Sequence, residues 1–306
     1  MKAFLVRRAG MSLVTLLAVS MLVFMLARLQ GDPRAVMLSD YTTNEQYEAW
    51  GREMGLDKPI AVQYVVYIGK VMKGDLGDSL LQDGTSVATL LWRRIPNTVQ
   101  LAMAAFAVAL ILGIPLGVLA AVTRGSVWDY GARSFAIFGH SAPSFWVGLI
   151  FIVVFAVELG WFPTSRKVDW DSIVLPAMAL GWGAAGGILR LMRSSMLEVL
   201  DSEYVKLAKA KGMSSVQVVW KHAFRNALIA PITAAGLLFA GLITGTVVTE
   251  SVFAWPGLGL LAIQAVNKSD YPVLQGVILL VTFIYVLTAL AVDLLYAYID
   301  PRIKYN

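Results

Sequence analysis

The sequence predicts an all-α integral membrane protein with six transmembrane helices, cytoplasmic termini and an extracytoplasmic insertion between helices 1 and 2. Hydrophobic residues make up 58% of the 306 residues and charged residues 15%, which is far from the balance of a soluble domain. The apolar residues are gathered in long runs, and a bilayer span needs about 20 of them. The runs that meet this need are 9–29, 98–122, 134–157, 172–189, 228–249 and 274–298.

The first run begins like a signal peptide but is predicted to remain as a membrane anchor. Lys2, Arg7 and Arg8 precede it, and its uncharged core extends from Met11 to Ala27. That core is longer than the usual apolar stretch of about 7–15 residues in a signal peptide, and no small-residue cleavage site follows it. We therefore interpret it as an uncleaved signal anchor.

Basic residues set the predicted orientation, because cytoplasmic segments of membrane proteins carry an excess of Lys and Arg. With the N-terminus inside, fourteen Lys and Arg residues fall in cytoplasmic segments and three in the short outer loops. The chain then divides into a first helix (1–29), an outer insertion (30–97), a five-helix domain (98–299) with a cytoplasmic loop at 190–227, and a cytoplasmic tail (300–306). The net charge of +5 reflects this asymmetry, and without an aromatic–basic pattern it predicts no nucleic-acid partner.

The outer insertion is the one stretch with a soluble character. It contains a polar, helix-compatible segment at 44–54 and an apolar, aromatic run at 60–72 that we expect to lie along the membrane surface. From its residues alone it is a structural lid over the outer face. Asp75, Asp78 and Asp83 lack the spacing and the terminal Glu of a calcium loop, so no metal site is predicted.

The most distinctive segment is a basic helix–glycine–helix unit at 203–226, set between two apolar runs. Gly212 can take a positive φ and end the first helix, and Ser214 with Gln217 predicts a capping box that starts the second. Three cations lie in the last turns of the first helix, where positive charge is favoured: Lys206, Lys209 and Lys211. Such a hairpin is suited to receive force from a soluble partner, and the alternative is an ordinary solvated loop.

The segment resembles the cytoplasmic coupling loop of permease subunits in binding-protein-dependent ABC importers of the dipeptide/oligopeptide type. That loop typically reads (D/E)-Y-V-x-x-A-x-A-K-G and then (R/K)-H-A-x-R-N-A. The matching residues are Glu203, Tyr204, Val205, Ala208, Ala210, Lys211, Gly212, Lys221, His222, Ala223, Arg225, Asn226 and Ala227. The chain departs from the family's general loop, because Lys206 and Leu207 replace a Glu-Ala pair and His222 and Arg225 stand where Ile and Pro would be.

Further marks of the same subfamily extend the resemblance over essentially the whole chain. They are Gly31-Asp32-Pro33, Gly74-Asp75-Leu76-Gly77, Gly113-Ile114-Pro115-Leu116-Gly117, Pro143-Ser144-Phe145-Trp146, Trp255-Pro256-Gly257-Leu258-Gly259, Asp270-Tyr271-Pro272 and Asp300-Pro301-Arg302.

The resemblance implies a type I ABC importer permease in a bacterial cytoplasmic (inner) membrane, moving peptides of the dipeptide/oligopeptide class. It implies a second homologous permease as heterodimer partner, two cytoplasmic ATPase subunits that use ATP and Mg, and an extracytoplasmic solute-binding protein. The residues implied in ATPase coupling are Glu203, Tyr204, Ala208, Lys209, Ala210, Lys211, Gly212, His222, Arg225 and Asn226. Those implied in the outer gate and in contact with the binding protein are Trp255, Pro256, Gly257, Asp270, Tyr271 and Pro272. For Trp255 and Tyr271, anchoring at the bilayer–water boundary is the alternative.

No pattern for chemistry is present, so we expect no enzyme and no cofactor bound by this chain. A phosphate-binding G-x-x-x-x-G-K-[ST] loop is absent, and the two histidines, His140 and His222, lie in different segments. An ATPase-independent channel or secondary carrier is the alternative class, although the spans hold few charges. Asp293 is the one ionisable residue deep in a span, and a structural ion pair is its expected role. Glutathione or a nickel chelate remains an alternative cargo.

Overall fold

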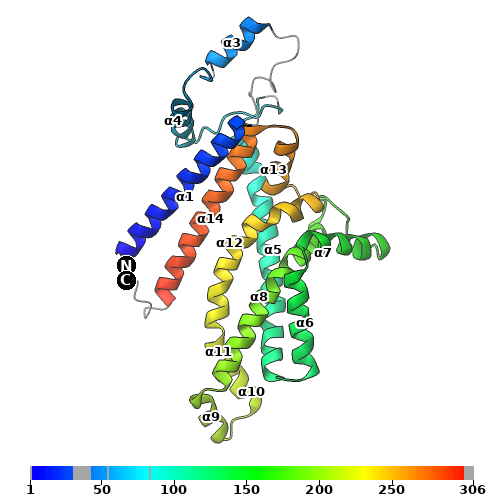
Figure 1. The fold of residues 1–306 in the computed structure, drawn as a ribbon. Coiled ribbons are helices and arrows are strands. Elements are labelled where there is room, and N and C mark those ends of the chain that lie inside the picture. Colours follow the sequence, from blue (N-terminus) through cyan, green and yellow to red (C-terminus); the bar gives the residue numbers. More distant parts are fainter. Residues whose placement is uncertain (1, 30–42, 54, 83, 300–306) are drawn as a thin grey trace. The chain divides into compact units, whose positions relative to one another are not determined.

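The computed structural model describes residues 2–29, 43–53, 55–82 and 84–299. The predicted tail at 300–306, the Gly31-Asp32-Pro33 and Asp300-Pro301-Arg302 marks and Asp83 lie outside the described residues. The described residues are mainly helical, and the β-pairing among them is limited to an isolated bridge between Asp78 and Ser86 (Figure 1). Its contacts form two compact units, one comprising the chain up to Asn97 with Pro256–Leu290, and the other centred on Thr98–Trp255.

The first unit combines the N-terminal helix, the outer insertion and part of the C-terminal region. Its elements are α1 (Lys2–Leu29), α3 (Asn44–Glu53), α4 (Ile60–Val71), the start of α5 (Val87–Val122), α13 (Leu258–Asn267) and most of α14 (Tyr271–Ile299). Its core contains Val87 and Leu91 of α5, Leu258 and Leu261 of α13, and Val277 of α14. These buried aliphatic side chains join segments that are far apart in the sequence.

The α4 helix, formed by the apolar run of the insertion, packs along α1. The Tyr64 hydroxyl lies 2.8 Å from the Ser20 hydroxyl, and the Phe24 ring lies 5.5 Å from the rings of Tyr64 and Tyr67. The exposed side chains of α4 include Val62, Val65 and Val66. An apolar helix with such a face is expected to lie at a membrane surface.

The second unit is built around one long helix, α8. Its elements are the rest of α5, α6 (Val127–Ser141), α7 (Ser144–Phe151), the π-helical η1 (Ile152–Glu158), η2 (Trp170–Ile173), α8 (Val174–Leu200), α9 (Glu203–Ala210), α10 (Ser215–Gln217), the π-helical η3 (Val218–Ala223), α11 (Phe224–Ala227) and α12 (Ile229–Val252). The α8 helix contacts α6, α7 and α12. It is therefore the helix that most of the unit packs against.

Small residues let α8 approach its neighbours at backbone distance. A Cβ atom added at Gly186 would lie 2.5 Å from the Ala136 carbonyl of α6, and one at Gly181 would lie 2.6 Å from the Ala105 carbonyl of α5. On the α5 side, a Cβ at Gly117 would lie 2.6 Å from Met192. Glycine is thus required where these helices meet, which is the usual device of helix packing in membranes.

Five helices are long and apolar enough to span a membrane. They are Val6–Leu29, Val87–Val122, Trp170–Leu200, Ile229–Val252 and Tyr271–Val292. Five of the six predicted runs fall within or largely within these helices. The interruption of the fourth run by Pro176 is tolerated, because Pro176 is the third residue of α8 and the first-turn N–H groups of a helix have no intrahelical acceptor.

The third predicted run, 134–157, contains a sharp break at Pro143, so it is two helices and not one straight span. The chain bends by 106° between Val127–Ser141 and Ser144–Glu158. The physical reason is Pro143, which restricts the residue before it to extended backbone: Ala142 has φ −80° and ψ 129°. The two helices together are long and apolar enough to count as a sixth candidate span only if the bent pair is taken as one, and His140 lies three residues before Pro143.

The segment between α12 and α14 is more helical than its prolines and glycines predict. Gly257 caps α13, which extends to Asn267, and turns flank this helix on both sides. Ala254 and Ser269 take φ values of 47° and 58° in these turns. The Trp255-Pro256-Gly257 mark thus begins a short apolar helix.

Candidate functional site

The predicted hairpin between α8 and α12 is folded, and its first turn has the geometry expected of Gly212. We call residues 201–227 the coupling hairpin. Gly212 has φ +82°, its N–H donates to the Lys209 carbonyl at 3.0 Å, and the Met213 N–H donates to the Ala208 carbonyl at 3.3 Å. These two bonds form a Schellman motif, which satisfies carbonyl groups at the end of α9. The predicted positive φ at Gly212 is confirmed.

The second half of the hairpin begins with the predicted capping box. The Gln217 N–H donates to the Ser214 hydroxyl, and the Ser214 N–H donates to the Gln217 side-chain oxygen, both at 3.3 Å. Helical geometry then continues without interruption through α10, η3 and α11. The turn between the two halves is therefore specified at both ends by local hydrogen bonds.

Three residues of the peptide-importer pattern, distant in sequence, meet across the hairpin. The Asn226 amide donates to the Tyr204 hydroxyl at 2.9 Å and to the His222 carbonyl at 3.1 Å. The Nε2 atom of His222 is buried and has no hydrogen-bond partner among the described residues. Residues of the peptide-importer sequence pattern thus form hydrogen bonds that connect α9 to the segment leading into α12.

Small and aliphatic side chains fix the hairpin to the end of the helix bundle. Val205 and Ala208 of α9 pack on Val218, while Ala223 and Ala227 pack against a cluster that includes Met196 of α8. Ala223 is completely buried, so a larger side chain there would collide with its neighbours. The hairpin therefore moves with the end of α8.

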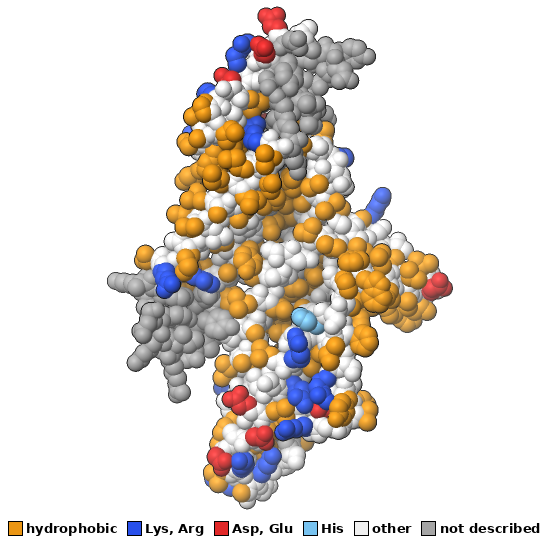
Figure 2. Space-filling view, viewed as in Figure 1, with side chains coloured by type: hydrophobic (Ala, Val, Ile, Leu, Met, Phe, Trp, Pro, Cys, Tyr) orange, Lys and Arg blue, Asp and Glu red, His pale blue; other side chains and the backbone are white. Residues whose placement is uncertain are grey.

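The outward surface of the hairpin combines exposed apolar groups with positive charge. Leu207, Val216 and Trp220 are 57%, 68% and 55% exposed, and Lys209 and Lys211 are exposed as well. Figure 2 shows charged side chains gathered at the end of the unit that carries α9 and α10. Exposed apolar groups beside cations are typical of a protein-docking surface.

The structure places the coupling residues in two groups. Ala208 is buried and His222 half-buried, so these two predicted coupling residues lie inside the hairpin. The exposed residues, which can reach a partner, are Glu203, Tyr204, Lys209, Ala210, Lys211, Gly212, Arg225 and Asn226.

An ion pair that the sequence analysis missed lies next to the hairpin. Both carboxylate oxygens of Asp129, in the first turn of α6, accept hydrogen bonds from Arg193 of α8, at 2.8 and 2.9 Å. The Gly125 N–H donates to the same carboxylate at 3.0 Å, and Arg133 lies at 3.4 Å. The Asp129 side chain is 1% exposed. The detectable signal was an acidic residue three positions after Ser126, the N-cap of α6.

Two residues predicted to face the outside are interior residues in this structure. Trp255 is 1% exposed and packs on Leu101 and Ala177, with the Lys167 ammonium 5.3 Å from its ring centre. This burial does not fit the alternative of an anchor at the bilayer–water boundary, and the outer-gate role of Trp255 stays a prediction. The large apolar surface of its ring is buried inside the second unit.

Asp270 is the second of these interior residues, at 3% exposed. It accepts hydrogen bonds from the Ser79 hydroxyl at 2.5 Å and from the Leu80 N–H at 3.2 Å, so it holds the end of the insertion to the α13–α14 turn. Its carboxylate therefore has partners inside the chain, and its contact with a binding protein stays a prediction. Of the other predicted gate residues Gly257 is buried, and Pro256, Tyr271 and Pro272 are half-buried.

Among the described residues, no group of three His, Cys, Asp or Glu side chains is arranged to hold a metal ion. Asp293 lies in α14, but its side chain is outside the described part, and its predicted ion pair stays a prediction.

Comparisons with known proteins match nearly the whole chain. Residues 113–305 match the family described as the binding-protein-dependent transport system inner membrane component, and residues 1–102 match the N-terminal region model of such membrane components. The oligopeptide transport system permease protein AppB of Bacillus subtilis is 37% identical over 316 residues, covering 100% of both chains. The di/tripeptide transport system permease protein DppB of Pseudomonas aeruginosa is 38% identical over 341 residues, again covering 100% of both.

The fold is also found among solved structures. A chain of the inward-facing MetNI methionine ABC transporter superposes with a TM-score of 0.59 at 22% identity, covering 69% of this chain and 96% of that one. At this identity the likeness concerns the fold.

Two substitutions at Gly212 distinguish the effect of its backbone conformation from the effect of side-chain size. We expect Gly212→Val to disrupt the hairpin turn, because a β-branched residue resists a φ of +82°. Gly212→Asn is the matched control, since Asn tolerates the left-handed region and a Cβ at this position meets no described atom within 4 Å. Transport rate per ATPase complex and co-purification of the ATPase subunits are the measurements. Equal loss in both variants would contradict the conformational explanation.

Removing the Asp129 carboxylate charge tests the ion pair. Asp129→Asn should lower the free energy of unfolding by about 3 kcal/mol, because it leaves the largely buried Arg193 without its counter-ion. The control is Arg124→Ala, which removes a pair of 3.9 Å whose side chains are 66% and 76% exposed, and which should cost less than about 1 kcal/mol. Thermal unfolding of the purified protein measures both, and similar effects for the two variants would refute a special role for Asp129.

Proposed function

Because the chain belongs to the family of binding-protein-dependent transport system inner membrane components, we propose that it is the permease subunit of a peptide-importing ABC transporter. The observation that carries the proposal is the exposed coupling hairpin at the end of a bundle of membrane-spanning helices. The names of the two full-length relatives point to peptides as the cargo, and they favour peptides over glutathione or a nickel chelate. The chain itself supplies a path and a lever.

Energy for the cycle comes from two ATPase subunits in the cytoplasm, which bind ATP and Mg and dock on the hairpin. Leu207, Val216 and Trp220 are the apolar part of that docking surface, and Lys209 and Lys211 are its charged part. An ATPase cleft that closes on these side chains displaces α9. Since α9 packs on Val218 and the segment that follows packs on Met196, the displacement is passed to α8.

A second, homologous permease completes the pathway as the partner of a heterodimer. Exposed apolar side chains on α7 and η1, including Trp146, Leu149 and Val153, supply a surface that needs either lipid or such a partner. An extracytoplasmic binding protein delivers the cargo to the outer side. Docking on the insertion remains part of this proposal, with a structural lid as the alternative role.

Both termini lie in the cytoplasm of a bacterial cell with the insertion outside the inner membrane. The excess of basic residues around the coupling hairpin supports this orientation. Within the second unit, the start of α6 lies at the same end as the hairpin, because Arg193, near the end of α8, reaches Asp129 at the start of α6. The chain between these residues therefore leaves the hairpin side and returns to it.

Reconstitution tests the transport proposal. In proteoliposomes holding this chain, its companion permease and both ATPases, uptake of a labelled dipeptide should require ATP, Mg and the binding protein. A complex without the ATPases is the control, and it should show no uptake above that of empty liposomes. Uptake that persists without ATPases or ATP would favour the channel or carrier class and overturn the proposal.

Cysteine labelling tests the orientation, because the chain has no native cysteine. Lys268→Cys lies at an exposed position in the α13–α14 turn. It should react with a membrane-impermeant maleimide in cells whose outer membrane has been permeabilised. Lys209→Cys, exposed on the hairpin, should react only after the inner membrane is opened. The reverse pattern would contradict the proposed orientation.

A further inference from the structure

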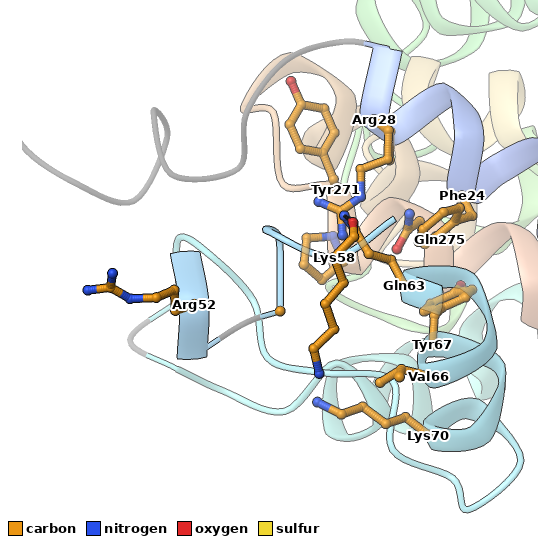
Figure 3. Close-up of a pocket in the computed structure, with 13 residues that line it drawn as sticks. Phe24, Arg28, Arg52, Lys58, Gln63, Val66, Tyr67, Lys70, Tyr271 and Gln275 are labelled. Carbon is orange, nitrogen blue, oxygen red and sulfur yellow. Dashed lines mark hydrogen bonds between the residues drawn. The ribbon is translucent and has the colours of Figure 1, made fainter. Parts of the chain in front are cut away.

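The first unit contains a pocket of about 370 Å³ between the insertion and two long helices (Figure 3). Its walls come from the end of α1, from α4 and the loop before it, and from the start of α14. The volume lies in the range of small-molecule sites. Nothing in the transport proposal uses this pocket.

The ionisable lining of the pocket is basic. Its charged residues are Arg28, Arg52, Lys58 and Lys70, with no Asp or Glu among the described lining. In Figure 3, Arg52 points away from the pocket, whereas Lys58 and Lys70 extend toward the same end of it. Neither lysine forms an ion pair with a described residue. Two neighbouring cations repel each other, so an anion between them is electrostatically favoured.

The lining also holds two buried polar atoms whose hydrogen-bonding capacity is unused within the described chain: the Gln63 side-chain oxygen and the Tyr67 hydroxyl. The Gln63 amide nitrogen donates to the Leu56 and Lys58 carbonyls at 3.1 and 2.7 Å, which fixes the side chain and leaves its oxygen as an acceptor. Burial, with a smaller contribution from Tyr64, raises the pKa of Tyr67 to about 12, so its hydroxyl keeps a proton to donate. Buried polar atoms of this kind normally have partners.

The pocket lies at the depth of lipid headgroups. Its α1 residues, Phe24, Ala27 and Arg28, belong to the last turns of a candidate span that ends at Leu29. Five residues of helix correspond to about 7.5 Å, so the pocket begins just inside the end of the span. The exposed apolar face of α4 beside it fits the same boundary.

We propose that this pocket binds the headgroup of an anionic phospholipid of the phosphatidylglycerol type. The phosphate sits between Lys58 and Lys70, whose side chains extend toward the same end of the pocket, and accepts a hydrogen bond from Tyr67. A headgroup hydroxyl donates to the Gln63 oxygen. An anionic headgroup that also carries a donor satisfies the cations and both unused atoms, whereas an ammonium headgroup would bring positive charge to a basic site. The lipid proposal rests on the proposed orientation in one respect only: the orientation decides which leaflet of the membrane supplies the lipid.

The test is lipid binding to the purified transporter complex, measured by native mass spectrometry with added phosphatidylglycerol or phosphatidylcholine. Lys58→Gln combined with Lys70→Gln should weaken phosphatidylglycerol binding about 25-fold, since each basic residue near an anionic lipid contributes roughly fivefold. Lys73→Gln is the matched control, because Lys73 is exposed in the same segment and lies outside the lining. Tyr67→Phe, which removes one hydroxyl, should weaken binding to a smaller extent.

Each outcome decides the proposal. Preference of the wild-type complex for phosphatidylglycerol, with selective loss in the Lys58/Lys70 and Tyr67 variants, supports it. Equal binding of the two lipids, or equal loss in the Lys73 control, overturns it. Displacement of the lipid by millimolar inorganic phosphate or glycerol phosphate would identify a soluble-anion site instead. If the double variant fails to fold, the lipid preference of the wild-type complex and the binding measured for the Tyr67 variant still test the proposal. Peptide uptake is measured separately, so the transport proposal and the lipid proposal can fail independently.

Discussion

Contact between helix backbones along α8 is the constraint on which the second unit depends. Gly186 and Gly181 leave no room for a Cβ atom against α6 and α5, and Gly117 receives the Met192 side chain. In a bilayer there is little hydrophobic force to hold apolar helices together, so close van der Waals packing must supply much of the stability. Everything that α8 carries, including the hairpin at its end, takes its position from these contacts.

The same helix explains how charge is accommodated beside an apolar bundle. Arg193 follows the tightly packed part of α8 and donates hydrogen bonds to the Asp129 carboxylate, which lies at the start of α6. A bidentate pair with extra hydrogen bonds offsets the cost of burying a carboxylate. The backbone contacts set the spacing of α6 and α8, and the ion pair sets their alignment along the bundle.

Local signals carried much of what could be predicted from the sequence. The spans followed from hydrophobic length, and the positive φ of Gly212 and the Ser214–Gln217 capping box followed from residues within one turn of each other. The bend at Pro143 was foreseeable as a break, but its 106° angle depends on what α7 packs against. The Asp129–Arg193 pair joins residues 64 positions apart, and no local pattern reports such a contact.

Residue type was a poor guide to position outside the helices. Trp255 was implied in the outer gate by the resemblance, with the bilayer–water boundary as the alternative because Trp is enriched there, yet its ring fills the interior beside Leu101. Asp270 was implied in the outer gate by the resemblance alone, yet its carboxylate accepts hydrogen bonds from the Ser79 hydroxyl and the Leu80 N–H. Both depend on partners that only the folded chain brings together, so periodicity and composition could not identify them.

The unbroken length of α8 has a mechanical consequence. The helix has 27 residues and is therefore about 40 Å long, with Met196 under the hairpin at one end and Ala177 against the Trp255 ring at the other. Its helical structure is continuous over this length, so a displacement at one end can be transmitted to the other. A tilt or axial rotation imposed at Met196 must therefore also displace Ala177 and strain the packing of the Trp255 ring on the opposite side of the membrane.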